Sequence, residues 1–441
     1  SVAGSLEFVW RDQSTIPRRL GHASDNSLAD VLIALASIVN AAVEVPIDHR
    51  LEAAEIESRW NRIGGHWLAP QQRDELIAKA LAAASDRQPL IALTDFNEPA
   101  GLSRRDPDRP SLVLWTSGTT GNPQGVTLSQ RNLCGNAAAK LAAVPQIGND
   151  IRLCSLPLSH AYARTCDFGT WLLSGCTQAL TLGFEGWQVQ APAVRPTLAN
   201  TVPCLADRLL RGDAWKLGLE RLRLLGCGGA AMSKTSFDAW RDRGVTVIQG
   251  YGLTETSPVI CSATPDDAAP GLVGKFVAGW EQQIRDGQLF VRGPHNMLGY
   301  WGDAAATAAR IDAQGWLDTR DLVEIDAMTQ QLRILGRADD VIVLASGRKL
   351  NPWPIEQELE QFDGVRHAVL VGRCGRLELW IDHADEFDRK LLRSVFRVRP
   401  RWQQPDCTSR LDPPLSRSAG ELTAKGTKRR GMIIENRFRD S

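Results

Sequence analysis

The stretch Thr116-Ser-Gly-Thr-Thr-Gly-Asn-Pro-Gln-Gly125 carries the clearest structural signal in this sequence of 441 residues. It follows the apolar run 111–115 and precedes the apolar residues Val126 and Leu128, so we expect a loop between two buried strands. Glycines let the backbone curl and bring its N–H groups close to an anion, and the hydroxyls add further donors. The loop is therefore suited to holding phosphates, although it lacks the Gly-Lys-Ser/Thr of the Walker pattern.

Outward from this loop, helical stretches alternate with short apolar strands. Helical spacing of apolar residues is present at 28–42, 51–62 and 73–84. Strands are expected at 43–46, 88–93, 111–116, 150–156, 178–182, 222–227 and 245–249. This alternation predicts an α/β fold with mainly parallel sheets.

From about residue 287 the pattern of alternating helices and strands gives way to short strand-like runs. Short strand-like runs at 288–292 and 331–334 predict a small β subdomain. Beyond the polar connection 336–340, a helix is expected at 354–362 between strands at 340–344, 368–371 and 377–382. We therefore expect a large N-terminal domain of several subdomains at 1–336 and a small, mobile α+β C-terminal domain at 337–441.

Composition excludes several classes of protein. Lys and Arg together number 51, and Asp and Glu together also number 51. Because the charges balance, a general nucleic-acid-binding surface is not expected. The nine cysteines include no C-x-x-C pair, which favours free thiols over disulfides or a zinc site. The most apolar stretch, 28–47, is interrupted by Asp30, Asn40 and Glu44, which predicts a core helix and no transmembrane segment. With no signal peptide recognised, we expect a cytoplasmic protein.

Three further motifs accompany the phosphate loop. They are Gly250-Tyr-Gly-Leu-Thr-Glu-Thr256, Gly315-Trp-Leu-Asp-Thr-Arg-Asp321 and Gly336-Arg-Ala-Asp-Asp340. With 116–125 they resemble, in the same order, the four signatures of the adenylate-forming superfamily, which comprises acyl- and aryl-CoA synthetases, luciferases and adenylation domains. The resemblance extends over nearly the whole chain.

The resemblance implies a two-step reaction. A carboxylate is a poor electrophile, so the acid first attacks the α-phosphate of ATP to give an acyl-adenylate and pyrophosphate. Mg²⁺ and oriented donors must offset the negative charge that this step brings together. Glu255 would ligate Mg²⁺, Thr254 would contact the α-phosphate, and His160 in Leu156-Pro-Leu-Ser-His160 would face the nascent acyl-phosphate.

The same resemblance assigns residues to the nucleotide and to the acid. Tyr251 and the segment 228–230 would flank the adenine, while Asp321, with two acceptor oxygens, and Arg337 would bind the ribose. The segment 161–175 would form one wall of the acid pocket and Gly250 the other. The expected nucleotide-binding residues are Thr116, Ser117, Gly118, Thr119, Thr120, Gly121, Gly229, Ala230, Tyr251, Gly252, Asp321 and Arg337.

Near the C-terminus, Gly420-Glu-Leu-Thr-Ala-Lys-Gly-Thr-Lys-Arg-Arg430 contains the expected catalytic lysine. The family carries a lysine in its C-terminal domain that bridges the acid and the α-phosphate during adenylation. A charge on a long flexible stem suits such a group. Lys425 fits this role best and Lys428 is the alternative. Asp339 matches the position of the hinge about which the domain rotates before coenzyme A attacks.

Three departures from the family pattern stand out. Gln124 takes the place of the usual lysine in the phosphate loop, and because it lacks a charge we expect weakened handling of pyrophosphate. Arg320 replaces the commoner glycine before Asp321, which should leave the role of Asp321 intact. Little sequence precedes the unit 28–46, so much of the usual N-terminal subdomain is expected to be missing.

The sequence therefore predicts an ATP-dependent acid–coenzyme A ligase that releases AMP. The segments 156–165 and 251–259 look most like those of fatty acyl-CoA synthetases. An aryl acid of the o-succinylbenzoate type remains an alternative substrate, and an acyl carrier protein remains an alternative acceptor. A catalytically degenerate nucleotide- or acyl-binding protein is the rival hypothesis from another class. Retention of Glu255, Asp321, Arg337 and Lys425 argues against it.

Overall fold

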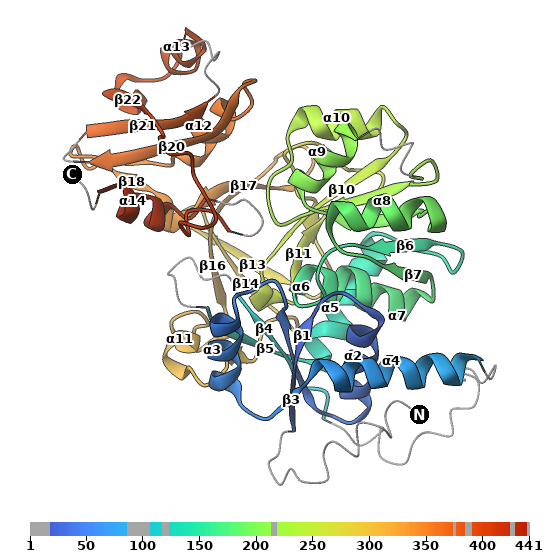
Figure 1. The fold of residues 1–441 in the computed structure, drawn as a ribbon. Coiled ribbons are helices and arrows are strands. Elements are labelled where there is room, and N and C mark those ends of the chain that lie inside the picture. The colour runs from blue at the N-terminus through green and yellow to red at the C-terminus, as the bar shows by residue number, and fades with distance from the viewer. Residues whose placement is uncertain are drawn as a thin grey trace. The chain divides into compact units, whose positions relative to one another are not determined.

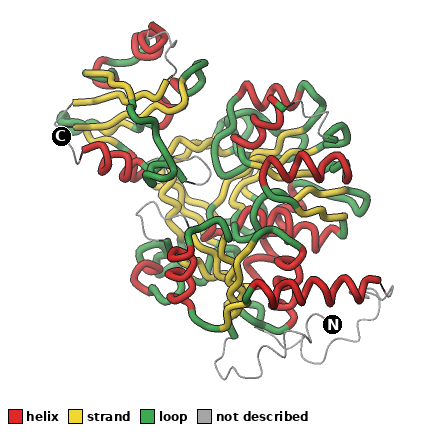
Figure 2. The backbone as a smooth tube through the Cα atoms, viewed as in Figure 1, coloured by secondary structure: helices red, strands yellow, loops and turns green. Residues whose placement is uncertain are grey.

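The computed structural model describes residues 18–85, 106–116, 123–212, 218–373, 376–383, 390–423 and 428–438. The chain forms two compact units (Figures 1 and 2). The first comprises residues 1–118, 122–281 and 292–317, and the second comprises 119–121, 282–291 and 318–441. The expected strand at 88–93, the loop residues Ser117–Gly121 and Lys425 lie outside the described residues.

The first unit contains a six-stranded sheet with the strand order β15-β5-β4-β2-β1-β3. Its strands β3, β1, β2 and β4 are parallel, β5 pairs antiparallel with β4, and β15 pairs antiparallel with β5. The strands are β1 (Arg19–Ser24), β2 (Val43–Asp48), β3 (His66–Leu68), β4 (Pro110–Trp115), β5 (Gly125–Ser129) and β15 (Gly299–Tyr300). The helices after β1, β2 and β3 are α2 (Leu28–Val39), α3 (Ala53–Ile63) and α4 (Pro70–Ser85).

A second sheet of seven strands follows the order β12-β11-β10-β9-β8-β6-β7, and from β10 to β7 it is parallel. The strands are β6 (Ile151–Cys154), β7 (Thr177–Leu180), β8 (Leu198–Thr201), β9 (Leu224–Cys227), β10 (Thr246–Gly252), β11 (Val259–Ser262) and β12 (Lys275–Phe276). The helices are α5 (Gln130–Ala143), α6 (Ala161–Ala163), α7 (Thr170–Ser174), α8 (Gly183–Val194), α9 (Pro203–Arg211), α10 (Lys234–Arg241) and α11 (Ala304–Ala308), with a π-helical turn η2 (Arg164–Gly169) and a 3₁₀ turn η4 (Thr254–Thr256). Fully buried Trp187 and Trp240 anchor the core beside β8 to β10.

The second unit is built on smaller sheets. A four-stranded sheet has the order β13-β14-β16-β17, and a three-stranded sheet has the order β20-β21-β22. The strands are β13 (Glu281–Arg285), β14 (Gln288–Arg292), β16 (Leu317–Ile325), β17 (Leu332–Arg337), β18 (Ile342–Val343), β19 (Lys349–Leu350), β20 (Val365–Arg373), β21 (Arg376–His383) and β22 (Cys407–Arg410). The helical elements are η5 (Ala338–Asp340), α12 (Trp353–Leu359), α13 (Lys390–Arg397), η6 (Arg401–Gln403) and α14 (Arg430–Phe438).

The expected α/β architecture with mainly parallel sheets is confirmed. The helix expected at 28–42 ends earlier, at Val39, and the strand β1 was not predicted. Every cysteine within the described residues is a free thiol. Among those residues, no helix combines the length and the apolar character needed to cross a bilayer.

A buried charge network fastens β1 to its neighbours in the first unit. His22, which is fully buried, lies 3.2 Å through Nε2 from Glu44 Oε1 and 3.4 Å through Nδ1 from Asp30 Oδ1. Arg164 and Arg73 donate to the same two carboxylates. Burial alone would lower the pKa of His22, but hydrogen bonds and charge from Asp30 and Glu44 raise it to about 9. The imidazolium is therefore part of the folded core.

We expect the free energy of unfolding of the first unit to fall as the pH rises from 6.5 to about 9. The folded-state pKa of His22 lies above its unfolded value. The stability that protonated His22 contributes is therefore fully present below pH 6.5 and is lost as the pH rises to about 9. The shift corresponds to about 3 kcal/mol. Urea denaturation of His22→Gln should show this alkaline slope removed, whereas His49→Gln, at a half-exposed histidine, should retain it. An unchanged slope in His22→Gln would contradict this account.

Candidate active site

The base of the phosphate loop is held by backbone contacts between its two ends. The Thr116 N–H donates to the Gln124 carbonyl at 3.0 Å, and the Gln124 N–H donates to Thr116 Oγ1 at 3.2 Å. Arg62, in the last turn of α3, reaches this base: its Nη1 donates to the Pro123 carbonyl at 2.5 Å and its Nη2 lies 3.5 Å from Gln124 Oε1. The guanidinium stacks 5.0 Å from the ring centre of Trp115. A cation thus lies beside the uncharged Gln124.

The carboxylate of Glu255 is held in place by contacts to one of its two oxygens. It lies in η4, is nearly buried, and its Oε1 accepts a hydrogen bond from the Tyr300 hydroxyl at 2.8 Å. Arg310 Nη2 lies 3.6 Å from the same oxygen. The second oxygen, Oε2, has no hydrogen bond or ion pair with any described residue. Mg²⁺ in nucleotide sites takes one or two protein carboxylates and completes its shell with phosphate oxygens and water, so Glu255 fits the expected ligand.

The segment around Tyr251 leaves no room for larger residues. Tyr251 and Gly252 end β10, and a side chain at Gly252 would place its Cβ 1.7 Å from the Pro258 carbonyl oxygen. Thr254 follows in η4 and is half-buried. After β9, Gly229 has a φ of +81°, a conformation that favours glycine, and Ala230 beside it is exposed. The expected adenine-binding residues thus lie at the carboxyl ends of β9 and β10, where open α/β sheets bind ligands.

His160 lies at the start of α6, next to the end of β2. Its Nε2 is 3.7 Å from Asp48 Oδ2, and its side chain is 35% exposed. Hydrogen bonds from Arg50 and His160 overcome the effect of burial and hold the pKa of Asp48 well below its usual range. Asp48 therefore stays ionised and can orient the imidazole of His160.

Asp321 and Arg337 pair across two adjacent strands of the second unit. Their residues face each other in the β16 and β17 ladder, and Arg337 Nη1 donates to Asp321 Oδ1 at 2.9 Å. Arg337 Nη2 also lies 3.6 Å from Asp339 Oδ2, and Arg320 Nη1 lies 3.9 Å from the same oxygen. The structure thus brings together the two expected ribose ligands and Asp339.

Arg320 has a left-handed backbone conformation, with a φ of +58°. This conformation costs residues with a side chain about 1 kcal/mol or more, which explains why glycine is common at this place in the family pattern. We expect Arg320→Gly to stabilise the second unit by about 1 kcal/mol in thermal unfolding. Arg333→Gly, in the middle of the β17 ladder, is the matched control and should destabilise it. Equal destabilisation by both variants would show that the conformation carries no strain.

Lys428 is fully engaged within the second unit. Its Nζ lies 3.0 Å from Glu356 Oε2, 2.7 Å from Glu360 Oε1 and 2.7 Å from the Ala368 carbonyl oxygen. Arg430 also donates to Glu356. Burial lowers the pKa of Lys428, but the two carboxylates outweigh it and raise the pKa overall. All three ammonium donors are in use, so Lys428 has the contacts of a structural residue.

Three side chains that were not predicted from the sequence contact the candidate site residues. Tyr300 and Arg310 contact Glu255 from 45 and 55 residues further along the chain. Arg62 lies 62 residues before Gln124. The one signal in the sequence was the absent lysine at position 124, which leaves the phosphate loop without a cation that another residue could supply.

Comparison with known proteins identifies the family. Residues 17–301 match the AMP-binding enzyme family, and residues 339–378 match the AMP-binding enzyme C-terminal domain. A feruloyl-CoA synthase from Amycolatopsis sp. is 28% identical over 360 residues, covering 75% of this chain and 70% of the relative. A 2-succinylbenzoate–CoA ligase from Listeria monocytogenes is 26% identical over 338 residues, with the same coverage of both chains.

The fold agrees with this match. The crystal structure of ATP-bound MatB from Rhodopseudomonas palustris superimposes with a TM-score of 0.81 at 21% identity, covering 99% of this chain and 92% of that one. Since the family match extends over more than half of the sequence, the chain belongs to the family of AMP-binding enzymes.

Proposed function

We propose that the protein activates an aromatic carboxylic acid as its acyl-adenylate and then transfers the acyl group to coenzyme A, releasing AMP. The coarser assignment, an AMP-forming acid–CoA ligase, is supported by the AMP-binding enzyme family and by relatives that are named as a CoA synthase and a CoA ligase. The observation that carries the proposal is the Glu255 carboxylate, held through one oxygen by Tyr300 and Arg310 with the other oxygen left for a cation.

In the adenylation step, this chain's residues position ATP and the acid. The loop 116–121 and Thr254 hold phosphates, Gly229, Ala230, Tyr251 and Gly252 bind the adenine, and Asp321 with Arg337 binds the ribose. Mg²⁺ bound at Glu255 would offset the charge of the phosphates. His160, oriented by Asp48, faces the carboxylate as it attacks.

Arg62 supplies the cation that Gln124 lacks. Its guanidinium is fixed at the loop base by the Pro123 carbonyl and the Trp115 ring. A planar guanidinium can donate to two phosphate oxygens at once. The expected weakness in pyrophosphate handling is therefore offset by a residue from α3.

Lys425 is the bridging lysine of the adenylation step, and the engagement of Lys428 by two carboxylates supports this choice. We place the C-terminal domain at 337–441. This domain then rotates about Asp339, which gives coenzyme A access to the acyl-adenylate. The ion pairs of Asp339 with Arg320 and Arg337 are exposed and weak, as a hinge requires. The free thiols of the described residues suit the reducing cytoplasm, where we place the protein.

The aromatic character of the substrate is supported by the relatives, one named for a feruloyl and one for a 2-succinylbenzoate substrate. A fatty acid is the second candidate, favoured by the likeness of segments 156–165 and 251–259 to fatty acyl-CoA synthetases.

The test is a panel of cinnamates, benzoates and fatty acids, assayed for AMP release with ATP and coenzyme A. We expect aromatic acids to give the highest kcat/KM and an acyl-CoA product by mass spectrometry. Highest kcat/KM with a fatty acid would reverse the order of the two candidates. If acyl-adenylate accumulates and no thioester forms, coenzyme A is not the acceptor, and a carrier protein becomes the proposed acceptor.

A further inference from the structure

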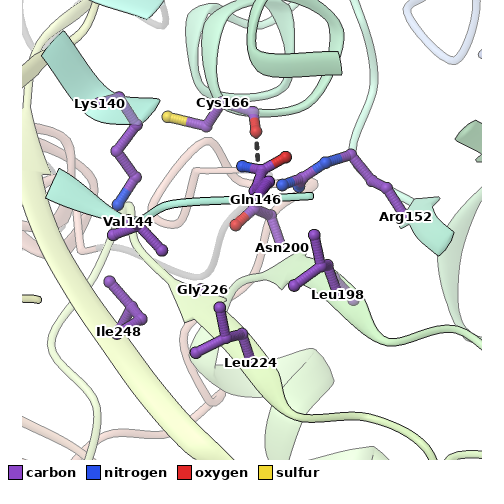
Figure 3. A pocket seen from close by; sticks show the side chains of 11 residues that line it. Lys140, Val144, Gln146, Arg152, Cys166, Leu198, Asn200, Leu224, Gly226 and Ile248 are labelled. Carbon is purple, nitrogen blue, oxygen red and sulfur yellow. Dashed lines mark hydrogen bonds between the residues drawn. The ribbon is translucent and has the colours of Figure 1, made fainter. Parts of the chain in front are cut away.

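A small enclosed space lies in the first unit between α5, η2 and one face of the seven-stranded sheet. Its volume is about 20 Å³, enough for a water molecule. Figure 3 shows part of its lining: Lys140 of α5, Val144 directly after that helix, Cys166 of η2 and Ile248 of β10 all border it. The lining mixes apolar residues with the polar side chains of Gln146, Arg152 and Asn200, and Lys140 is one of two buried cations in it.

Lys140 is buried with one polar partner. Its Nζ donates to Ser262 Oγ at 2.7 Å, and the described residues place no carboxylate within 4.0 Å of it. An ammonium has three donors, so two remain for a group in the cavity. Burial lowers the pKa of Lys140 to about 8, and Arg152 acts in the same direction. A buried cation without a counter-ion is costly unless something neutralises it.

The other charged groups at the cavity do not neutralise Lys140. Arg152 Nη1 is paired with Asp167 Oδ1 at 2.6 Å, and Asn200 donates to the same carboxylate oxygen. Burial raises the pKa of the Cys166 thiol to about 12, so it is uncharged. None of these groups therefore offsets the charge of a protonated Lys140. In addition, Arg152 Nε is buried without a hydrogen-bond partner among the described residues.

The cavity continues the walls of the expected acid pocket. Cys166 belongs to the segment 161–175, and Ile248 lies two residues before Gly250, on the same face of β10. Between the cavity and Gly228, the Tyr162 hydroxyl lies 3.3 Å from Asn200 Oδ1. A Cβ on Gly228 would lie 3.2 Å from the Tyr162 ring. One continuous face of β9 and β10 thus runs from the expected adenylate site to Lys140.

We propose that Lys140 binds a second carboxylate at the far end of the acid substrate, so that the enzyme selects diacids over monoacids of the same length. The proposal rests on the proposed function, because it treats the cavity as the distal end of the acid pocket. The carboxylate replaces water in the cavity, accepts the two remaining donors of Lys140 and neutralises its charge. Lys140 is then a specificity-determining residue that takes no part in the chemistry.

The test compares matched pairs of acids in ATP–pyrophosphate exchange: cinnamate with 4-carboxycinnamate, and a series of fatty acids with the α,ω-diacids of equal chain length. We expect the best diacid to have a KM roughly tenfold to a hundredfold below that of its monoacid. A wild-type enzyme that uses monoacids and rejects the diacid at every length overturns the proposal without any variant. Exchange with none of the acids overturns the proposed function instead.

Lys140→Met keeps the length of the side chain and removes the charge. We expect it to abolish the preference for the diacid by raising the KM of the diacid, with kcat/KM for the monoacid retained or improved. Lys234→Met, at an exposed lysine of α10, is the matched control and should keep the wild-type preference. An equal loss for both acids in Lys140→Met would assign the residue a structural role and overturn the proposal.

Discussion

We expect Lys425→Ala to lower acid-dependent adenylation about a thousandfold, the upper range for loss of one preorganised donor at a developing charge. Thioester formation from supplied acyl-adenylate should stay nearly intact, because the bridging lysine acts in the first step only. Both half-reactions are measured on the same preparation: pyrophosphate exchange for the first, and acyl-CoA formation from synthetic acyl-adenylate for the second.

Lys428→Met is the matched control for this experiment. It leaves Glu356 and Glu360 without their shared cation in a buried setting, which should destabilise the second unit by about 3 kcal/mol. Both half-reactions should then fall together with the melting temperature. Equal loss of both half-reactions in Lys425→Ala, at an unchanged melting temperature, would contradict the role of Lys425 in the first step.

The second large effect is expected at the base of the phosphate loop. Arg62→Ala removes the cation beside Gln124 and should reduce pyrophosphate exchange by roughly 30-fold, which corresponds to about 2 kcal/mol for a charge-assisted hydrogen bond. In the Arg62→Ala background, Gln124→Lys should restore most of the activity. In the wild-type background the same Gln124→Lys change should have little effect, because Arg62 already supplies the charge.

Arg59→Ala serves as the control, since Arg59 lies on the same helix and pairs with Glu55 within it. This variant should leave pyrophosphate exchange close to that of the wild type. If Gln124→Lys raises exchange equally in the presence and in the absence of Arg62, the two positions act independently and Arg62 does not replace the missing lysine.

Periodicity predicted the regular elements because their burial patterns are simple. The strand expected at 43–46 lies within β2 (Val43–Asp48), whose residues are all buried, and short buried strands are recognisable without any structure. By contrast, β1 contains Gly21 and His22 within Arg19–Ser24, a composition typical of a turn. It is a strand because it pairs in parallel with β2 and β3, and its buried His22 is balanced there by Asp30 and Glu44, which lie close to it only in the fold.

The candidate site residues likewise fall into those that the sequence predicts and those that only the fold brings together. Glu255, Asp321 and Arg337 were predicted as site residues because each belongs to a short motif that resembles a family signature. Tyr300, Arg310, Arg62 and Lys140 lie on other elements, and only the packing of these helices and strands in the fold brings them to their partners. Tyr300, for example, reaches Glu255 because β15 pairs with β5. Contacts of this kind depend on tertiary structure and leave no local pattern in a single sequence.

The most direct test of the central claim is acid-dependent ATP–pyrophosphate exchange by the wild-type protein, because this exchange requires adenylation and assumes no acceptor. We predict exchange that depends on an added carboxylic acid and is highest with aromatic acids, and that is lost in Lys425→Ala. Measurable ATP binding without exchange for any acid would contradict the account and would favour a nucleotide-binding protein that has lost catalysis.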